Sequence, residues 1–199
     1  MSAAMKLSLI AIVCLVVLFG VVILLYGVWL SNDIIKADEN SKAAWSQVLN
    51  QYQRRSDLIP NLVDTVKAYA SHEKEVLTAV TEARSKVNNF RIDESLLKDS
   101  EKLLQFQKIQ GELSGALTKL MAVVENYPNL KANENFLGLQ AQLEGTENRI
   151  AVERMRFIDT VNTYNKKVRT FPGSLFGYQT KPNFVAEAGA EKAPKNLFK

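Results

Sequence analysis

The sequence predicts an all-α protein in which one membrane-spanning helix is followed by an antiparallel helical bundle. Three observations lead to this prediction. The run 7–30 contains no charged side chain. Between residues 41 and 169, apolar residues recur every three or four positions, which is the spacing of a helix face packed on a core. In the same stretch Pro60 and Pro128 are the only prolines, so little interrupts helix formation.

Residues 1–6 form a short N terminus, and residues 7–30 are predicted to span the bilayer. As a helix this run is ~36 Å long at ~1.5 Å per residue, enough to cross a hydrocarbon core of ~30 Å with some tilt. Tyr26 and Trp29 near its end suit the membrane interface. A cleavable signal peptide has a shorter apolar core and a small-residue cleavage site, which favours an uncleaved anchor. Lys6 and the terminal amine on one side balance Lys36 and Lys42 on the other, which leaves the orientation undecided.

Charge and cysteine usage exclude two classes of protein. The net charge is +4, with acidic and basic residues interleaved along the chain. Nucleic-acid binding requires clustered cations facing the phosphates, so no nucleic-acid partner is expected. Cys14 is the only cysteine, and a disulfide-stapled fold is therefore excluded.

The bundle domain is expected over residues 31–170, on three apolar series. One runs from Trp45 to Val87 without a slip, the second from Leu103 to Tyr127, and the third from Phe136 to Val168 with one slip. Spacings this close to a heptad are typical of coiled-coil-like seams.

Turns are predicted where local chemistry stops a helix. Asn88-Asn89 with Asp93 marks one, and Asn126–Asn129 marks another, because the residue before Pro128 avoids the helical conformation. Both connections are short, so the helices should be antiparallel. Around Pro60 two alternatives stay open. Ser56 or Asp57 could cap a new helix with the proline in its first turn, or one long helix continues with a kink.

Five polar residues interrupt the apolar series: Arg55, Glu73, Gln110, Thr146 and Glu153. A buried polar layer of this kind can set the register between helices. The interpretation we favour is simpler, with these side chains at seam edges or bundle ends and partly hydrated.

Residues able to support catalysis are few. His72 lacks the second histidine of an H-E-x-x-H zinc site, because position 76 is Val76. Ser71 and Lys74 match the S-x-x-K pattern of acyl-transfer enzymes without its companion motifs. The sequence therefore predicts no catalytic, cofactor or metal site and no enzyme activity. An enzyme using His72 or the Ser71/Lys74 pair is the weakest alternative.

Longer blocks of sequence carry a resemblance to a known family. The blocks are RRSDLIPNLV (54–63), HEKEV (72–76), TEARSK (81–86), LEGTENRIAVERMRF (143–157) and the tail FPGSLFGYQTKPNF (171–184). They resemble the LemA family of prokaryotic membrane proteins. The resemblance implies a four-helix up-and-down bundle behind an N-terminal membrane helix, in a prokaryotic cell membrane, with the bulk of the chain in the cytoplasm. The family has no established catalytic residues, so none is carried over.

These observations predict a membrane-anchored scaffold or adaptor. Residues 7–30 would contact the bilayer, and the bundle would bind other membrane or membrane-proximal proteins or further copies of the chain. The alternative is a membrane-organising or lipid-contacting protein, for which Lys166, Lys167 and Arg169 with the aromatic tail are the candidates.

The tail, residues 171–199, is rich in aromatic, proline and glycine residues. Phe171, Phe176, Tyr178 and Phe184 would be costly to leave in water, so they are expected to cover something. We favour their folding back onto the bundle over docking on a partner or on the bilayer. The last ~15 residues are expected to be disordered, as chain termini often are.

Overall fold

The computed structural model describes residues 3–185 and confirms the all-α prediction, since the described residues contain helices and no strand. Four long helices and one short helix are connected by turns and two 3-10 helices. In chain order they are α1 (Ala3–Tyr69), α2 (Lys74–Asn89), η1 (Glu94–Leu97), α3 (Ser100–Val124), α4 (Pro128–Lys131), α5 (Glu134–Arg169) and η2 (Gly173–Phe176). The disorder expected for the end of the tail concerns residues 186–199, which lie outside the described residues.

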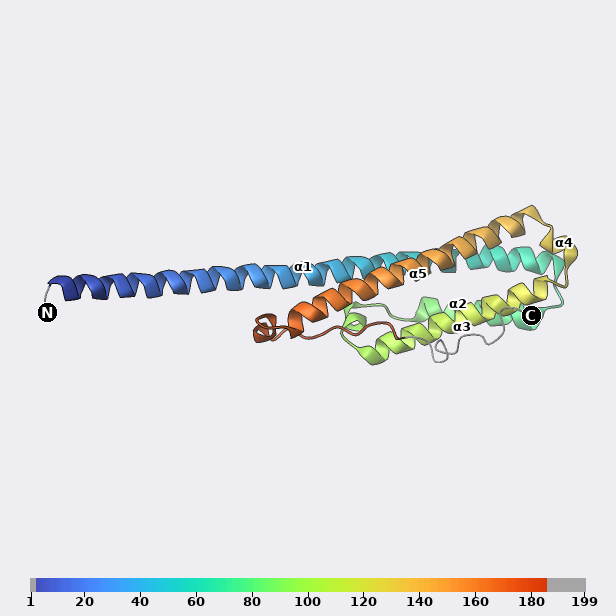
Figure 1. Cartoon of the computed structure of the whole chain (residues 1–199). Helices are drawn as coiled ribbons and strands as arrows, with labels where there is room; N and C mark the ends of the chain where they lie inside the picture. Colours follow the sequence, from blue (N-terminus) through green and yellow to red (C-terminus); the bar gives the residue numbers. More distant parts are fainter. Residues whose placement is uncertain (1–2, 186–199) are drawn as a thin grey trace, which may run out of the picture.

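Helix α1 is a single helix of 67 residues, which corresponds to ~100 Å at ~1.5 Å per residue. Its N-terminal part projects beyond the bundle (Figure 1), and the large apolar side chains from Ile12 to Trp29 are exposed. By length and composition this part can cross a membrane. Tyr26 and Trp29 stack there with ring centroids 6.0 Å apart. The C-terminal part of the same helix forms one wall of the bundle.

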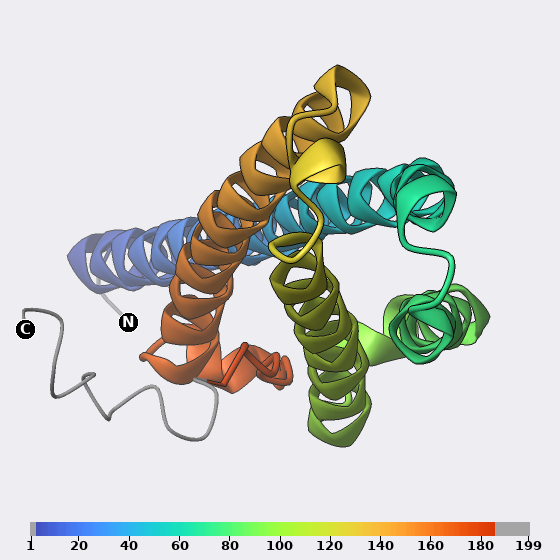
Figure 2. The same ribbon diagram turned by 90° about the vertical axis from the view of Figure 1, so that its right-hand side faces the viewer.

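The bundle consists of α5 packed along α1, with α2 and α3 packed on each other beside them (Figures 1 and 2). The helices α1 and α5 are antiparallel, because α5 ends at the side from which the apolar part of α1 projects. The short helix α4 connects α3 to α5 at the opposite end. The turns predicted at Asn88-Asn89 and at Pro128 are confirmed, since α2 ends at Asn89 and α3 ends at Val124.

The core follows the predicted seams closely. Buried side chains on α3 run from Leu103 to Val124, and those on α5 run from Phe136 to Val168. An aromatic cluster fills the middle of the bundle, with the ring of Trp45 5.5 Å from that of Phe106 and 5.2 Å from that of Phe157. The three-and-four spacing therefore identified the buried faces of three helices correctly.

The prediction of one uninterrupted seam from Trp45 to Val87 is wrong. The chain reverses at residues 70–73, and Ala70 and Leu77 are buried where the series had Tyr69 and Val76. Nothing in the local sequence demands this break. A helix continued through residue 73 would carry the apolar face of α2 away from α3, so burial between helices outweighs local helix propensity.

Pro60 lies inside α1, so the alternative of a new helix capped by Ser56 or Asp57 is wrong. Proline has no backbone N–H, and the carbonyl four residues earlier, that of Ser56, loses its helical partner. The structure supplies a replacement from α2, because Arg84 Nε donates a hydrogen bond to the Ser56 carbonyl at 2.9 Å. Ser56 Oγ also lies 3.0 Å from Asn88 Oδ1. The proline thus creates an acceptor that fastens α2 to α1.

The favoured interpretation of the polar seam residues is also wrong for three of the five. Arg55, Gln110 and Thr146 are buried, whereas Glu73 and Glu153 are partly exposed as expected. Arg55 and Gln110 bind each other across helices, which a single series cannot reveal, whereas the Thr146 hydroxyl donates to the Gln142 carbonyl of its own helix.

We predict that Arg84 and Pro60 are energetically coupled. Arg84→Ala leaves the Ser56 carbonyl unpaired, with an expected loss of about 1–3 kcal/mol. In a Pro60→Ala background the restored N–H can donate to that carbonyl, so the same substitution should be clearly less damaging. Chemical denaturation of the four proteins of this double-mutant cycle measures the effect. An equal loss in both backgrounds would contradict the assignment.

Candidate functional site

The first polar group of interest is the buried guanidinium of Arg55, which is 1% exposed. Its Nη1 donates to Glu147 Oε1 at 2.7 Å and to Ser114 Oγ at 2.8 Å. Its Nη2 donates to Gln110 Oε1 at 2.5 Å, and the ring of Tyr52 lies 5.2 Å from the guanidinium carbon. One side chain of α1 is therefore bound to both α3 and α5, a role that suits the planar fork of arginine.

The Arg55 group lies at the edge of the core. The carboxylate of Glu147 remains 40% exposed, so water reaches one end of the ion pair. Burial raises the pKa of Tyr52, and the nearby positive charges of Arg154 and Arg55 oppose that rise. Arg55, Arg84, Glu147 and Arg154 all belong to the sequence blocks on which the family resemblance rests. These blocks meet in space at the junction of the helices.

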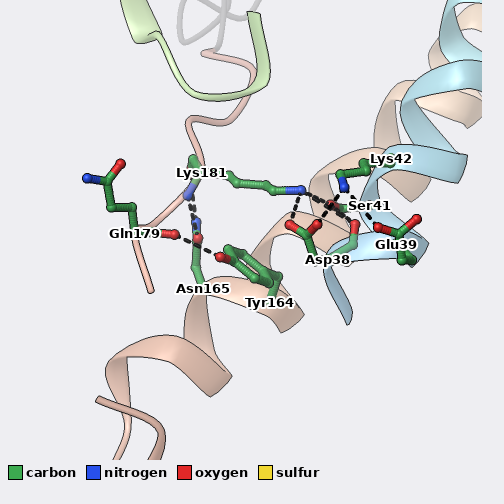
Figure 3. A network of polar contacts seen from close by, with 8 residues as sticks. All are labelled: Asp38, Glu39, Ser41, Lys42, Tyr164, Asn165, Gln179 and Lys181. Atoms are coloured by element: carbon green, nitrogen blue, oxygen red, sulfur yellow. Dashed lines mark hydrogen bonds and ion pairs between the residues drawn. The ribbon is translucent and has the colours of Figure 1, made fainter. Parts of the chain in front are cut away.

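The second polar group binds the tail to α1 a short distance after the apolar run. We call this group the tail latch; it consists of Lys181, Asp38, Ser41 and Asn165 (Figure 3). The buried Lys181 Nζ lies 2.7 Å from Asp38 Oδ1 and 2.6 Å from Ser41 Oγ. Asn165 of α5 pairs with the Lys181 backbone in both directions, at 2.8 Å each. The latch therefore joins three segments that are distant in sequence.

The charges of the latch are balanced by neighbouring side chains. Burial raises the pKa of Asp38, but hydrogen bonds and charge from Lys181 and Lys42 together hold it below its ordinary value of 3.8. Lys42 lies 2.8 Å from Glu39 and 2.9 Å from Asp38, and these contacts raise its pKa. The Asp38 carboxylate is consequently charged at neutral pH, as an ion pair with the buried Lys181 requires.

Beyond the latch, the tail enters the seam between α3 and α5. The ring of Phe184 lies 5.8 Å from that of Trp45 and 5.5 Å from that of Phe157, beneath the guanidinium of Arg154 at 4.6 Å. Gln107 of α3 donates to the Val185 carbonyl at 3.0 Å. The prediction that the tail folds back is confirmed for this part of the chain.

The four aromatic residues of the tail do not behave alike. Phe184 is buried, and Tyr178 is partly buried with its hydroxyl 3.0 Å from Ser31 Oγ. Phe171 and Phe176 remain exposed, so the expectation that all four cover the bundle is wrong for these two.

The α3–α5 seam stays open at the end of the bundle farther from the apolar helix. There it forms a groove of about 560 Å³ with an apolar floor and polar edges. We call it the α3–α5 groove. Its lining residues are Ser114, Leu117, Thr118, Met121, Gln140, Leu143, Glu144, Glu147 and Asn148. Ser114 and Glu147 also bind Arg55, so the groove is continuous with the buried polar group.

The structure does not bring the candidate catalytic residues into any cavity described here. Ser71 and His72 are exposed in the turn between α1 and α2, and Lys74 is exposed at the start of α2. Within residues 3–185, no group of three or more His, Cys, Asp or Glu side chains could hold a metal ion. Of the basic residues considered for lipid contact, Lys166 and Arg169 are exposed. Lys167 instead pairs with Asp33 at 2.7 Å.

Sequence analysis missed Asp38, Ser41 and Lys181. The buried face of α1 continues from Trp45 back through Ser41 and Ala37 to Ile34, so extending the three-and-four spacing would have found Ser41. Asp38 follows Ala37 and is only partly buried. Lys181 gave no signal, because the tail has no periodicity.

An all-α bundle carried on an exposed, apolar N-terminal helix defines the class of protein. Within that class, the chain belongs to the LemA family, whose family model matches residues 44–198. The chain is 24% identical over 140 residues to Protein LemA of Metamycoplasma hominis, covering 70% of this chain and 60% of that protein. It is likewise 24% identical over 165 residues to Magnetosome protein MamQ 2 of Paramagnetospirillum magneticum, covering 75% and 61%. The chain thus spans about 60% of the length of these relatives.

We predict that the Arg55–Glu147 pair contributes far more stability than an exposed pair. Glu147→Gln leaves a buried guanidinium without its counter-ion, and a loss of about 3 kcal/mol is expected, at the low end for such a site because Glu147 is partly hydrated. The exposed interhelical pair Lys86–Glu112, at 2.9 Å, provides the control. Glu112→Gln should change the free energy of unfolding far less than Glu147→Gln does, because both groups of this pair are in water. Equal effects in denaturation experiments would contradict the role assigned to Arg55.

The tail latch should weaken in acid. Because its pKa is lowered in the folded state, Asp38 stabilises the latch above the ordinary carboxyl pKa, and this contribution is lost as the pH falls through the lowered value. Fluorescence of Trp45, which contacts Phe184, should report tail release in an acid titration. At neutral pH, Asp38→Asn should increase amide exchange at residues 178–185, whereas Glu39→Gln, on the exposed neighbour, should not. Unchanged exchange in Asp38→Asn would show that the latch does not hold the tail.

Proposed function

We propose that this LemA-family protein is a non-catalytic scaffold, anchored in a prokaryotic cell membrane by the apolar part of α1, which binds partner proteins through its bundle. The observation that carries the proposal is the continuity of α1. Its apolar part passes directly into the buried face that begins at Ile34, with no flexible linker. Such a connection would hold the bundle at a fixed height above the bilayer, as a scaffold requires.

The α3–α5 groove is the proposed contact surface. In the half of the seam nearer the apolar helix, the tail already occupies the space between the two helices, with Phe184 in the core and the Val185 backbone bound to Gln107. The open half offers Leu117 and Leu143 as an apolar floor and amide and carboxylate groups along its edge. An extended or helical partner segment with one large apolar side chain matches this surface.

Two features support a role without catalysis. Ser71 and His72 occupy a surface turn at the end of the bundle remote from the membrane segment. The buried side chains of Arg55 and Lys181 each bind carboxylate and hydroxyl partners from other segments, which suits holding the chain together rather than attacking a substrate.

Site-specific photo-crosslinking in the intact membrane tests the proposal. A photoreactive amino acid at Thr118, on the rim of the groove, is expected to form discrete crosslinks to protein. The matched control is Thr81 on α2, which is also exposed and whose hydroxyl also donates to the carbonyl four residues earlier at 2.9 Å. Crosslinks between two copies of the chain would identify the partner as the protein itself.

A pair of substitutions completes the test. Thr118→Arg should remove the proteins that co-purify with the full chain in mild detergent, whereas Thr81→Arg should retain them. The absence of any protein crosslink at Thr118, together with identical co-purification in both variants, would refute the groove as a partner site.

A further inference from the structure

Outside the apolar part of α1, the two most exposed apolar side chains of the described residues lie in one turn. Around η2, Phe171 is 80% exposed and Leu175 is 74% exposed, with Phe176 beside them at 41%. We call these three residues the η2 tip. An exposed apolar cluster of this kind normally marks a contact site, since soluble surfaces seldom carry one. Gly173 before these side chains and Lys181 and Phe184 after them are buried, so the tip is not simply loose chain.

The tip is held beside the end of the apolar run by several contacts. Gly173 is buried against Ile34, and a Cβ at this position would collide with the Lys167 carbonyl, so only glycine allows this approach. Lys167 pairs with Asp33, and Tyr178 reaches Ser31. Gly177 then turns the chain away with a φ of 69°, a conformation that glycine adopts readily.

These contacts set the height of the tip relative to a membrane. Ser31 to Ile34 follow directly after Leu30, the last residue of the apolar run, within ~6 Å along the helix axis. The interfacial zone on each side of the hydrocarbon core is of similar thickness, ~5–7 Å. Figure 1 shows η2 at the end of the bundle from which the apolar part of α1 projects. If α1 spans a bilayer, the tip therefore lies at headgroup level.

The charges around the tip suit a lipid surface. Lys166 and Arg169 at the end of α5 and Lys36 on α1 are exposed, and no ion pair involves them among the described residues. The carboxylate of Asp33, the nearest acid on α1, is paired with Lys167. An apolar cluster bordered by cations is the arrangement by which peripheral segments bind an anionic bilayer interface.

We propose that the η2 tip inserts into the bilayer interface and that Lys166 and Arg169 bind anionic headgroups, giving the bundle a second membrane contact beside α1. With α1 alone the bundle could rotate about the helix axis and tilt. A second contact fixes which face of the bundle is turned toward the membrane. This proposal rests on the membrane anchoring proposed above.

Quenching of site-specific fluorophores on the full chain in lipid nanodiscs tests it. One label is placed at Leu175→Cys in a Cys14→Ala background. A control label is placed at Met155→Cys in the same background, since Met155 on α5 is 65% exposed and far along the helix from the tip. The Leu175 label should be quenched by lipids carrying a nitroxide near the glycerol end of the acyl chain and protected from aqueous iodide. The Met155 label should show the reverse.

A third label, on the native Cys14, separates failure of this proposal from failure of the anchor. Lipid quenching at Cys14 with iodide quenching at Leu175 would overturn the inserted tip and leave the anchor intact. Iodide quenching at both would overturn the anchor as well.

The role of the cations is tested by Lys166→Gln with Arg169→Gln in the Leu175-labelled protein. Each cation near an anionic surface contributes about fivefold to partitioning. Lipid quenching should therefore fall in discs that contain phosphatidylglycerol and stay unchanged in phosphatidylcholine alone. The same quenching as the parent in both kinds of disc would show that these cations bind no headgroups.

Discussion

The continuity of α1 is the constraint on which the rest of the structure depends. After the apolar run, the same helix continues without interruption. It carries Asp33, Asp38, Ser41, Trp45, Arg55 and Pro60. Asp33 binds the end of α5, and Asp38 and Ser41 together bind the tail. Trp45 belongs to the aromatic core, and Arg55 binds α3 and α5. Pro60 frees the Ser56 carbonyl that binds α2. The bundle is therefore assembled on one face of a single rod, and its position relative to the apolar run follows from that rod.

Buried polar contacts give this assembly its register. Apolar seams tolerate sliding, because one leucine replaces another at little change in buried area. The Arg55 guanidinium satisfies Gln110, Ser114 and Glu147 together in only one arrangement of α1, α3 and α5. Arg84 sets the position of α2 along α1 in the same way. Its acceptor is the Ser56 carbonyl, the one that Pro60 leaves without a helical hydrogen bond. These contacts specify which packing forms, and apolar burial supplies most of the stability.

Sequence reasoning succeeded where periodicity carries the information. The seams of α3 and α5 could be read directly, because the same faces that repeat in sequence are buried in the structure. It failed at residues 70–73, where the chain reverses. This reversal allows α2 to pack on α3, and no residue in the turn itself predicts it. It also misjudged Arg55, whose counter-ion Glu147 lies 92 residues away on another helix. The partners of Lys181 were out of reach for the same reason.

Whether α1 is rigid across the junction between its apolar part and the bundle can be measured by pulsed electron paramagnetic resonance in nanodiscs. One spin label is attached to the native Cys14 and the other to Asn50→Cys, both exposed on α1. An unbroken helix places these positions ~54 Å apart, at ~1.5 Å per residue. The account predicts a single narrow distribution at that distance. A broad distribution, or a shorter distance produced by bending between residues 30 and 45, would contradict it.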